Sequence, residues 1–554
     1  MTRWQLRDFQ LVWLNFAIVL FLGIFVLYPL FSVFKTSLIY KGTFNAEYFL
    51  ELFYGKHYLI RPLLNSLLLA STTGLLCTTF GLILSFAIAK ANIPGAKLFR
   101  YILMLPLISP PFLMALALIL LLGRNGILTR WLTTTFGIRF NIYGFPGLVI
   151  TQFFTFLPLA FLTAEAVVEM LARSQVEEAS VDLGASRWKT FTRISMPLIS
   201  PGVLSAFLIT FIRSLEDFGN PIVIQGRFPV LTTQVYLAIT GMYNVPLAAT
   251  LASILLIFSF SLFMLYKMSL KGKSYVLLTG RQSQPTRNQK IYVSGLARFL
   301  LFIITLLISL AILTLYGIIF VGAFTKLWGI DYTLTLSNFD YVFGVARGYL
   351  INSLKLAGIS TIVGGVLGTI IAYLVARKKI ALAGFVDFIA LLNFAVPGIV
   401  LGLGFVLAFN TPPLKLTGSA LIIVMVFVTQ RMPVVIREVD SVLRQVDVSL
   451  DEASADLGSS TFKTLLKIIV PIILPGIIGS MAYMFAACIT SISAVIMVVS
   501  PKWYLITLSM LSQIDLGALS VACAFGVVII VLVFGIIVVF DIFGKRAIQY
   551  LLNK

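Results

Sequence analysis

The chain has 554 residues, of which 59% are hydrophobic and 11% are charged. Ordinary soluble domains carry roughly 25% charged residues. Its mean hydropathy is +1.03, and a chain so apolar cannot cover its own surface in water, which excludes a soluble multidomain protein. The net charge is +20, but the basic residues lie between apolar runs rather than in one patch, so we expect no nucleic-acid partner. The composition predicts an all-α polytopic protein in the lipid bilayer.

Twelve apolar runs predict twelve membrane-spanning helices, because each is long enough to cross about 30 Å of hydrocarbon as a helix. Strands of a membrane barrel would instead alternate over about ten residues. Pro158 interrupts the fourth run, and the segment Gln430 to Pro433 interrupts the tenth. The expected spans are 10–34, 63–89, 99–122, 147–171, 198–218 and 246–268 in the first half, and 299–324, 350–376, 382–409, 418–436, 472–499 and 518–543 in the second.

Lys and Arg are more frequent in the segments that lie on the same side of the membrane as the N-terminus. The positive-inside rule then places both termini in the cytoplasm. The first run follows Arg3 and Arg7 and lacks a small-residue cleavage site, so it is expected to be an uncleaved helix. The polar stretch 269–297 is expected to be a cytoplasmic linker between a first half, 1–268, and a second half, 298–554.

Neither cysteine chemistry nor nucleotide chemistry is supported by the sequence. The three cysteines lie far apart inside apolar runs, and the single histidine, His57, lies in a predicted loop. This pattern argues against a disulfide framework, a metal site and a Ser-His-Asp triad. The triplet Gly272-Lys273-Ser274 lacks the earlier glycine of a phosphate-binding loop, since residue 267 is Lys. We therefore expect no catalytic residue, no metal site and no cofactor in this chain.

The two halves of the chain are internal repeats. The segment EASVDLG at 178–184 recurs as EASADLG at 452–458, an offset of 274 residues. The segment LNSL at 64–67 recurs as INSL at 351–354, an offset of 287 residues. The offset shrinks because the outer loop near 123–147 is longer in the first half. With six spans each, both halves enter the membrane the same way round, and their pseudo-twofold axis is expected to follow the membrane normal.

The repeated cytoplasmic segments resemble the EAA loop of bacterial ABC-importer permeases. That family pattern is Glu-Ala-Ala, three residues, Gly, nine residues, Ile, one residue, Leu and Pro. Both copies here, near 172–197 and 444–471, keep this spacing, with Ser in place of the second Ala and with Met196 or Val470 before the Pro. The resemblance implies a fused, two-repeat permease with the type I importer fold, similar to the ferric-iron permeases and, close by, to thiamine permeases.

The resemblance also implies partners and roles. Each loop is expected to dock one of two ATPase subunits, which would use the ATP, while an extracytoplasmic solute-binding protein is expected on the outer face of the bacterial inner membrane. The glycine of each loop can adopt a left-handed conformation that ends a short helix, and Ser186 and Ser460 can cap the next one. The residues that carry this coupling role are Glu178, Ala179, Ser180, Gly184, Ile194, Pro197, Glu452, Ala453, Ser454, Gly458, Ile468 and Pro471.

Polar residues within spans are costly in lipid and are therefore candidates for a translocation path. In the fifth span, Arg213 and Asp217 are spaced i,i+4 and Arg213 and Glu216 i,i+3, so the cluster can be either a self-neutralising pair at the outer boundary or a group that faces the cargo. Asn220 follows the cluster, and the equivalent stretch in the second half offers the hydroxyls of Ser491 and Ser493.

The cargo stays open at the level of the sequence. The carboxylates suit ferric iron, whereas Arg213, Arg227 and Arg431 suit phosphonates or sugar phosphates, and thiamine is a further alternative. An ion-driven secondary transporter would show the same even repeat of six spans. It would have no reason to repeat the Glu-Ala-Ser segment, and we therefore favour an ATP-driven importer. The resemblance to the ferric-iron permeases implies ferric iron as the favoured cargo.

Overall fold

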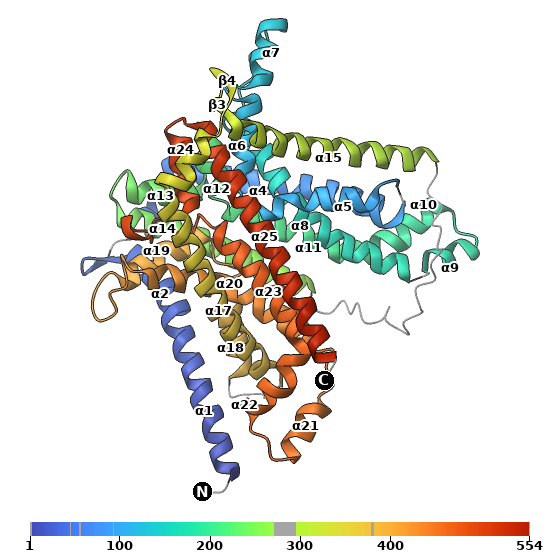
Figure 1. Cartoon of the computed structure of the whole chain (residues 1–554), viewed down its shortest axis with the longest axis vertical. Coiled ribbons are helices and arrows are strands. Elements are labelled where there is room, and N and C mark those ends of the chain that lie inside the picture. Colours follow the sequence, from blue (N-terminus) through green and yellow to red (C-terminus); the bar gives the residue numbers. More distant parts are fainter. Residues whose placement is uncertain are drawn as a thin grey trace.

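The computed structural model describes residues 3–44, 46–54, 57–91, 93–174, 176–270, 295–377 and 382–552. Within this part, the chain is almost entirely helical and carries two short antiparallel hairpins, one after the first span of each half. The all-α polytopic fold is therefore confirmed. Most of the expected linker, 269–297, lies outside the described residues. Figure 1 shows α5, α8 and α11 of the first half running across the view together with α15, whereas α17, α23 and α25 of the second half run down it together with α1.

The elements of the first half follow in chain order. They are α1 (Arg3–Leu22), η1 (Gly23–Leu27), α2 (Tyr28–Leu38), β1 (Ile39–Tyr40), β2 (Thr43–Phe44), α3 (Glu47–Phe53), α4 (His57–Ser85), η2 (Phe86–Lys90), α5 (Ala96–Met104), η3 (Leu105–Ile108), α6 (Leu113–Leu122), α7 (Ile127–Phe136), α8 (Phe145–Arg173), α9 (Val176–Asp182), α10 (Arg187–Thr190), η4 (Phe191–Ser195), α11 (Met196–Glu216), α12 (Gly219–Ile224), α13 (Leu231–Thr240) and α14 (Val245–Leu270).

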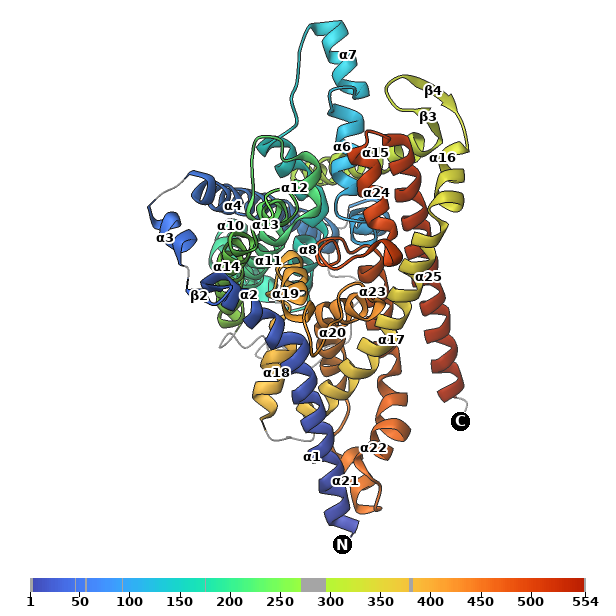
Figure 2. The same ribbon diagram turned by 90° about the vertical axis from the view of Figure 1, so that its left-hand side faces the viewer.

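The second half repeats this order with fewer insertions. Its elements are α15 (Gly295–Phe324), β3 (Thr325–Leu327), β4 (Asp331–Leu334), α16 (Ser337–Asp340), η6 (Tyr341–Val345), α17 (Arg347–Arg377), α18 (Ala383–Leu392), α19 (Gly398–Phe409), α20 (Ala420–Leu443), α21 (Ser449–Asp456), α22 (Thr461–Thr464), η7 (Leu465–Ile469), α23 (Val470–Ile489), η8 (Pro501–Trp503), α24 (Ile506–Asp515) and α25 (Leu519–Leu552). The loop near 123–147, which is longer than its second-half counterpart, contains α7, which projects from the end of the molecule in Figures 1 and 2.

Eleven helices in the described part of the chain are long and apolar enough to cross a membrane. The ninth expected span, 382–409, is not continuous but is divided into α18 and α19 by a turn that ends at Pro397. The third expected span, 99–122, is divided in the same way into α5 and α6, around Pro106, Pro110 and Pro111. Proline removes an amide donor and clashes with the preceding turn, which explains why both halves break at the same place.

The eleventh expected span, 472–499, is also shorter than predicted. Helix α23 ends at Ile489, and the next residues form turns. The residues after Ile489 include Thr490, Ser491 and Ser493, and Ser and Thr favour a helix less than the apolar residues Leu and Ala do. By contrast, Pro158 and Pro433 lie inside the continuous helices α8 and α20, so the fourth and tenth spans are uninterrupted.

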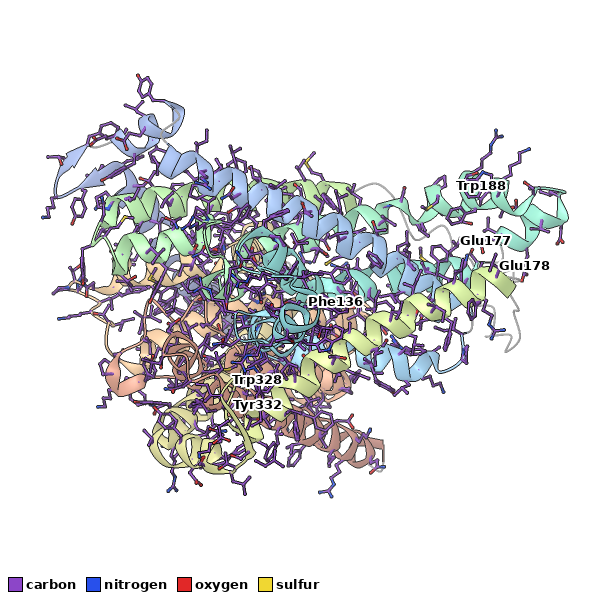
Figure 3. All side chains as sticks on the ribbon, turned by 90° about the horizontal axis from the view of Figure 1, so that it is seen from above. Phe136, Glu177, Glu178, Trp188, Trp328 and Tyr332 are labelled. Atoms are coloured by element: carbon purple, nitrogen blue, oxygen red, sulfur yellow. The ribbon has the colours of Figure 1, made fainter. Side chains whose placement is uncertain are left out.

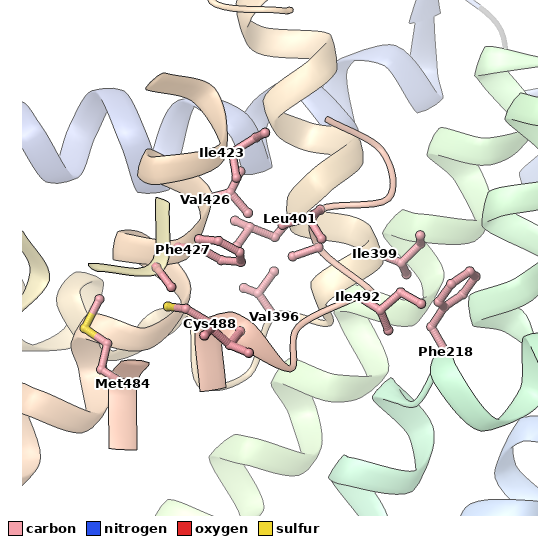
Figure 4. Packing of buried hydrophobic residues seen from close by; sticks show 14 of the residues in the cluster. Phe218, Val396, Ile399, Leu401, Ile423, Val426, Phe427, Met484, Cys488 and Ile492 are labelled. Atoms are coloured by element: carbon pink, nitrogen blue, oxygen red, sulfur yellow. The ribbon is translucent and has the colours of Figure 1, made fainter. Parts of the chain in front are cut away.

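The first span of each half crosses to the other half. Helix α2 packs against α14 of its own half and against α19 of the second half, and α15 packs against α25 and against α5 and α6 of the first half. Figures 1 and 2 show α1 beside the second-half helices, and Figure 1 shows α15 beside those of the first half. One buried cluster consequently contains residues of both halves. In Figure 4, Phe218 of the first half lies beside Ile399 and Ile492 of the second.

Small residues let the helices approach closely where polar backbone is buried. A Cβ atom at Gly402 of α19 would lie 2.3 Å from the carbonyl oxygen of Ala494, in the turn after α23. At Gly479 of α23, nothing lies within 4 Å of such an atom. Close backbone contact through small residues is a main source of helix association in lipid, where the hydrophobic effect does not act between helices.

We predict that Gly402→Ala lowers the melting temperature of the purified protein, because the new methyl group displaces the 490–500 turn. Gly479→Ala is the matched control and should leave the melting temperature unchanged or raise it, since Ala favours a helix over Gly by about 1 kcal/mol. The measurement is thermal unfolding in detergent. Equal effects of the two substitutions would contradict the close packing of α19.

Candidate functional site

Each copy of the repeated Glu-Ala-Ser segment forms a corner of two short helices. In the first corner, α9 ends in Gly184, whose φ is +84°, and the amide of Ala185 donates to the carbonyl of Ser180 over 3.1 Å. In the second corner, Gly458 has a φ of +78°, and the amide of Ser459 donates to the carbonyl of Ser454 over 3.0 Å. This arrangement is the Schellman motif, which favours Gly because the left-handed region strains other residues. The predicted left-handed glycines are confirmed.

The second helix of each corner starts at a serine. The hydroxyls of Ser186 and Ser460 accept from the amides of Lys189 and Lys463, both over 3.4 Å. Each corner then continues through a π-helical segment, η4 or η7, into the next span, which has a proline, Pro197 or Pro471, in its first turn. Ile194 and Ile468 lie in these π-helical segments and are half-buried.

A hydroxyl pair closes each corner internally. Ser180 Oγ lies 2.9 Å from Thr190 Oγ1, and Ser454 Oγ lies 2.8 Å from Thr464 Oγ1. All four side chains are buried. The two serines occupy the position where the family pattern has Ala, so the departure from the pattern has a structural explanation. The two threonines were not singled out from the sequence, although they too recur at the offset of 274 residues.

The outer surface of each corner exposes apolar side chains. Leu183 is 89% exposed and Leu457 is 88% exposed at equivalent positions, and Trp188 and its equivalent Phe462 are also exposed. Glu178 and Ala179, like Glu452 and Ala453, share this exposed surface. Figure 3 shows Glu178 and Trp188 at the far end of the first-half helices, away from Phe136 and Trp328. Sequence reasoning did not select the exposed leucines and aromatic residues.

The second corner begins with an ionised cap. Asp447 Oδ1 accepts from the amide of Ser449 over 2.9 Å, immediately before α21. The amide and the hydroxyl of Ser449 hold the pKa of Asp447 below its usual range. A carboxylate at the N-terminus of a helix also interacts favourably with the helix dipole. The start of α21 is thus fixed while the corner itself remains exposed.

A polar cluster lies between the two halves. In α11, Arg213 Nη1 lies 3.2 Å from Glu216 Oε2, and the carboxylate also interacts electrostatically with Arg431 of the second half. Arg431 lies midway along α20, whereas Glu216 is the last residue of α11. Glu216 Oε1 and Arg431 Nε are buried and have no hydrogen-bond partner among the described residues.

Asp217 does not pair with Arg213, which corrects the i,i+4 expectation. Helix α11 ends at Glu216, and Asp217 has extended backbone geometry, so its side chain leaves the helix face that carries Arg213. Its Oδ2 instead accepts from Gln152 over 3.0 Å and from the Nδ2 of Asn220 over 2.8 Å. Its Oδ1 accepts from the amide of Asn220 over 3.3 Å, at the start of α12. Asp217 and Asn220 therefore belong to a buried structural network.

The second half lacks this charged network. Ser491, which is equivalent to Asp217, is buried, and its Oγ has no hydrogen-bond partner in the described part of the chain. Ser493 Oγ lies only 2.2 Å from where a Cβ atom of Gly398 would be, so it contacts the start of α19 directly. The equivalent of Gln152 is Phe427, because Pro158 of α8 matches Pro433 of α20. The polar network around Asp217 therefore has no counterpart among the described residues of the second half.

The chain matches the family described as binding-protein-dependent transport system inner membrane component twice, over residues 78–273 and 364–549. It is 36% identical to the ferric transport system permease protein FbpB of Actinobacillus pleuropneumoniae, over 93% of this chain and 75% of the relative. It is also 36% identical to the putative ferric transport system permease protein FbpB 1 of Haemophilus influenzae, over 87% and 77%. The molybdenum transport system permease protein ModB of Escherichia coli is 30% identical over 37% of this chain and 89% of the relative.

We predict that Glu216→Gln reduces the amount of assembled protein, because it leaves the Arg213 and Arg431 charges without a neutralising carboxylate. Breaking a buried ion pair costs about 3–5 kcal/mol. The double variant Arg213→Gln/Glu216→Gln should regain most of the wild-type amount in membranes, measured by quantitative immunoblot.

The control for this prediction is Asp331→Asn, which removes the partner of Lys326 in the exposed outer hairpin and should have little effect. Wild-type abundance of the single Glu216→Gln variant would show that the carboxylate does not neutralise the cluster.

Proposed function

Since the chain belongs to the family of binding-protein-dependent transport system inner membrane components, we propose that it forms the passage through which an ATP-driven importer carries ferric iron. The chain is a multi-pass inner membrane protein of two permease repeats. The observation that carries the choice of cargo is the 36% identity, over most of the chain, to two relatives named ferric transport permeases.

The two corners are the docking sites for two ATPase subunits, one on each. The repeated geometry of the corners supports this docking role. Each left-handed turn presents an exposed leucine and an exposed aromatic residue, which are Leu183 and Trp188 in the first corner and Leu457 and Phe462 in the second. Large exposed apolar side chains beside charged ones are typical of interaction surfaces. The corners and both termini then lie in the cytoplasm, and a solute-binding protein delivers cargo to the opposite face.

Glu216 lies on the path between the halves, and the positive charges of Arg213 and Arg431 partly neutralise its negative charge. Buried polar atoms without partners are rare in folded proteins and are expected where a polar cargo passes. Glu216 Oε1 and Arg431 Nε are such atoms, and they come from different halves. The double variant Arg213→Gln/Glu216→Gln should therefore assemble but import less than the wild type. The chain itself hydrolyses nothing and holds no cofactor; ATP is used by the partner subunits.

The cargo is tested by reconstituting the chain with its ATPase subunits and binding protein in proteoliposomes. We expect ATP-dependent uptake of radioactive ferric iron that unlabelled thiamine, molybdate and a phosphonate do not reduce. Uptake of one of these competitors in place of iron would overturn the choice of cargo and leave the importer class intact. Uptake driven by an ion gradient without ATPase subunits would instead favour a secondary transporter.

Docking is tested by the double variant Gly184→Val/Gly458→Val. A β-branched residue strains the left-handed turns, so the ATPase subunits should no longer co-purify and uptake should be lost, while the protein still inserts into the membrane. The matched control is Gly137→Val, because Gly137 has a φ of +68° at the end of the outer helix α7 and no atom within 4 Å of an added Cβ. Normal ATPase co-purification in the double variant would contradict the docking role.

A further inference from the structure

The base of each corner is held by a basic residue at the inner end of the second span of its half. Lys90 Nζ lies 2.6 Å from both carboxylate oxygens of Glu177, the residue before the Glu-Ala-Ser triplet. Glu177 also accepts from the hydroxyl of Ser195, at the end of η4. The carboxylate therefore joins the second span to the entry and to the exit of the first corner. Lys90 is 8% exposed and is thus largely shielded from water and salt.

The second half contains the same connection in different residues. Arg377 is equivalent to Lys90 and Asp451 to Glu177. Arg377 Nη1 lies 4.0 Å from Asp451 Oδ2, and the hydroxyl of Tyr373 donates to Asp451 Oδ1 over 2.6 Å. Arg377 also donates to the carbonyls that precede α21. Asp451 is thus joined to the second span by Tyr373 and Arg377, so the contact between this span and the entry of the corner is kept although its residues differ. The contact with the exit of the corner is not repeated, because Ile469 stands at the position of Ser195.

In the first half, the outer end of the second span, α4, is hydrogen-bonded to the segment that follows the polar cluster. Ser66 Oγ accepts from the amide of Leu231, the first residue of α13, over 2.8 Å. Asn65 Nδ2 donates to the carbonyl of Pro229 over 2.9 Å. The first amides of a helix have no partner within the helix, so Ser66 supplies one from another span. Asn65 thus joins the second span to the segment that precedes α13.

The second half repeats the outer contacts. Ser353 Oγ accepts from the amide of Ile506, the first residue of α24, over 2.9 Å. Asn352 Nδ2 donates to the carbonyl of Lys502 over 3.1 Å. The next residues of α13 and α24 are threonines, which donate to the carbonyls of residues 217 and 491 over 2.7 Å and 2.9 Å. The contacts therefore reach the backbone beside the proposed path.

We propose that α4 with η2 in the first half, and α17 in the second, are connecting helices that move each corner and the segment beside the path as one unit. In both halves, 25 residues separate the outer Asn from the inner basic residue, which corresponds to about 38 Å of helix. Lys90, Glu177, Arg377 and Asp451 are then positioning residues for energy coupling. This inference rests on the proposed function, because it assumes that ATPase subunits act on the corners.

The inner contact is tested in proteoliposomes that contain the permease, the ATPase subunits and the binding protein. The double variant Glu177→Gln/Asp451→Asn removes both charges with nearly unchanged shape. We expect the ATPase subunits to co-purify at wild-type amounts, while the ferric iron imported per ATP hydrolysed falls about tenfold, within the range of typical coupling between sites. The control is Asp541→Asn, which removes an exposed ion pair with Lys545 at the end of α25 and should leave the ratio unchanged.

An unchanged ratio in the double variant overturns the inference. If the double variant is poorly produced, the variant Lys90→Glu/Glu177→Lys tests the inner contact instead, because it keeps the ion pair with the charges reversed. Recovery of both protein and ratio supports the inference, whereas recovery of protein with a ratio that is still low overturns it. Wild-type vesicles without ATP-dependent uptake would refute the proposed function itself, which separates that failure from the failure of the connecting helices.

The outer contact gives an independent test. Ser66→Ala/Ser353→Ala should lower the same ratio, because the connecting helices then lose the amides of α13 and α24. Combined with the inner double variant, it should add little further loss, since both sets of substitutions interrupt one connection. Independent, fully additive losses would show that the two ends act separately and would overturn the inference.

Discussion

Every amide and carbonyl inside a bilayer needs a partner within the protein, and this constraint governs where the helices of this chain stop. The two broken spans, α5 with α6 and α18 with α19, stop where other helices surround them. At the first break, Ser109 is hydrogen-bonded to Tyr316 of α15, the span that crosses from the other half. At the second, Asn393 donates to the carbonyl of Thr429 in α20. A side chain at each break is thus hydrogen-bonded to a neighbouring helix.

The first span of each half packs against the other half, and this packing meets the same need to shield the backbone from lipid. Helix α2 packs on α19 and α15 packs on α6, so each broken span of one half is covered by a continuous helix of the other. Tight backbone contact follows, as at Gly402 and Ala494. The two permease repeats are thus interlocked by their first spans. The corners extend from the ends of the two bundles, as Figure 1 shows.

The two halves resemble each other more in geometry than in the identity of equivalent residues. The corners share their turn, their serine–threonine pair and their exposed leucine, yet the ion pair beneath them is Lys–Glu in one half and Arg–Asp in the other. At the centre, the symmetry ends: Gln152, Asp217 and Asn220 form a hydrogen-bonded network in the first half, where the second half has Phe427 and Ser491. The same scaffold therefore carries two equivalent corners and one charged, asymmetric cluster between its halves.

The sequence by itself determined the membrane class, the repeat, the left-handed glycines and the caps of the corners. These features depend on composition and on interactions between residues close in the chain, which leave a local pattern. It could not place the breaks at Pro397 and before α6, because proline is tolerated inside α8 and α20 where neighbouring helices satisfy the backbone.

Only the tertiary structure decided which charges meet. The i,i+4 spacing favoured a pair between Arg213 and Asp217, but the end of α11 at Glu216 turned Asp217 toward Gln152 and left Arg213 to Glu216. The contacts of Lys90 with Glu177 and of Ser66 with Leu231 join residues 87 and 165 positions apart. Such contacts follow from how the spans pack, and a single sequence contains no local signal for them.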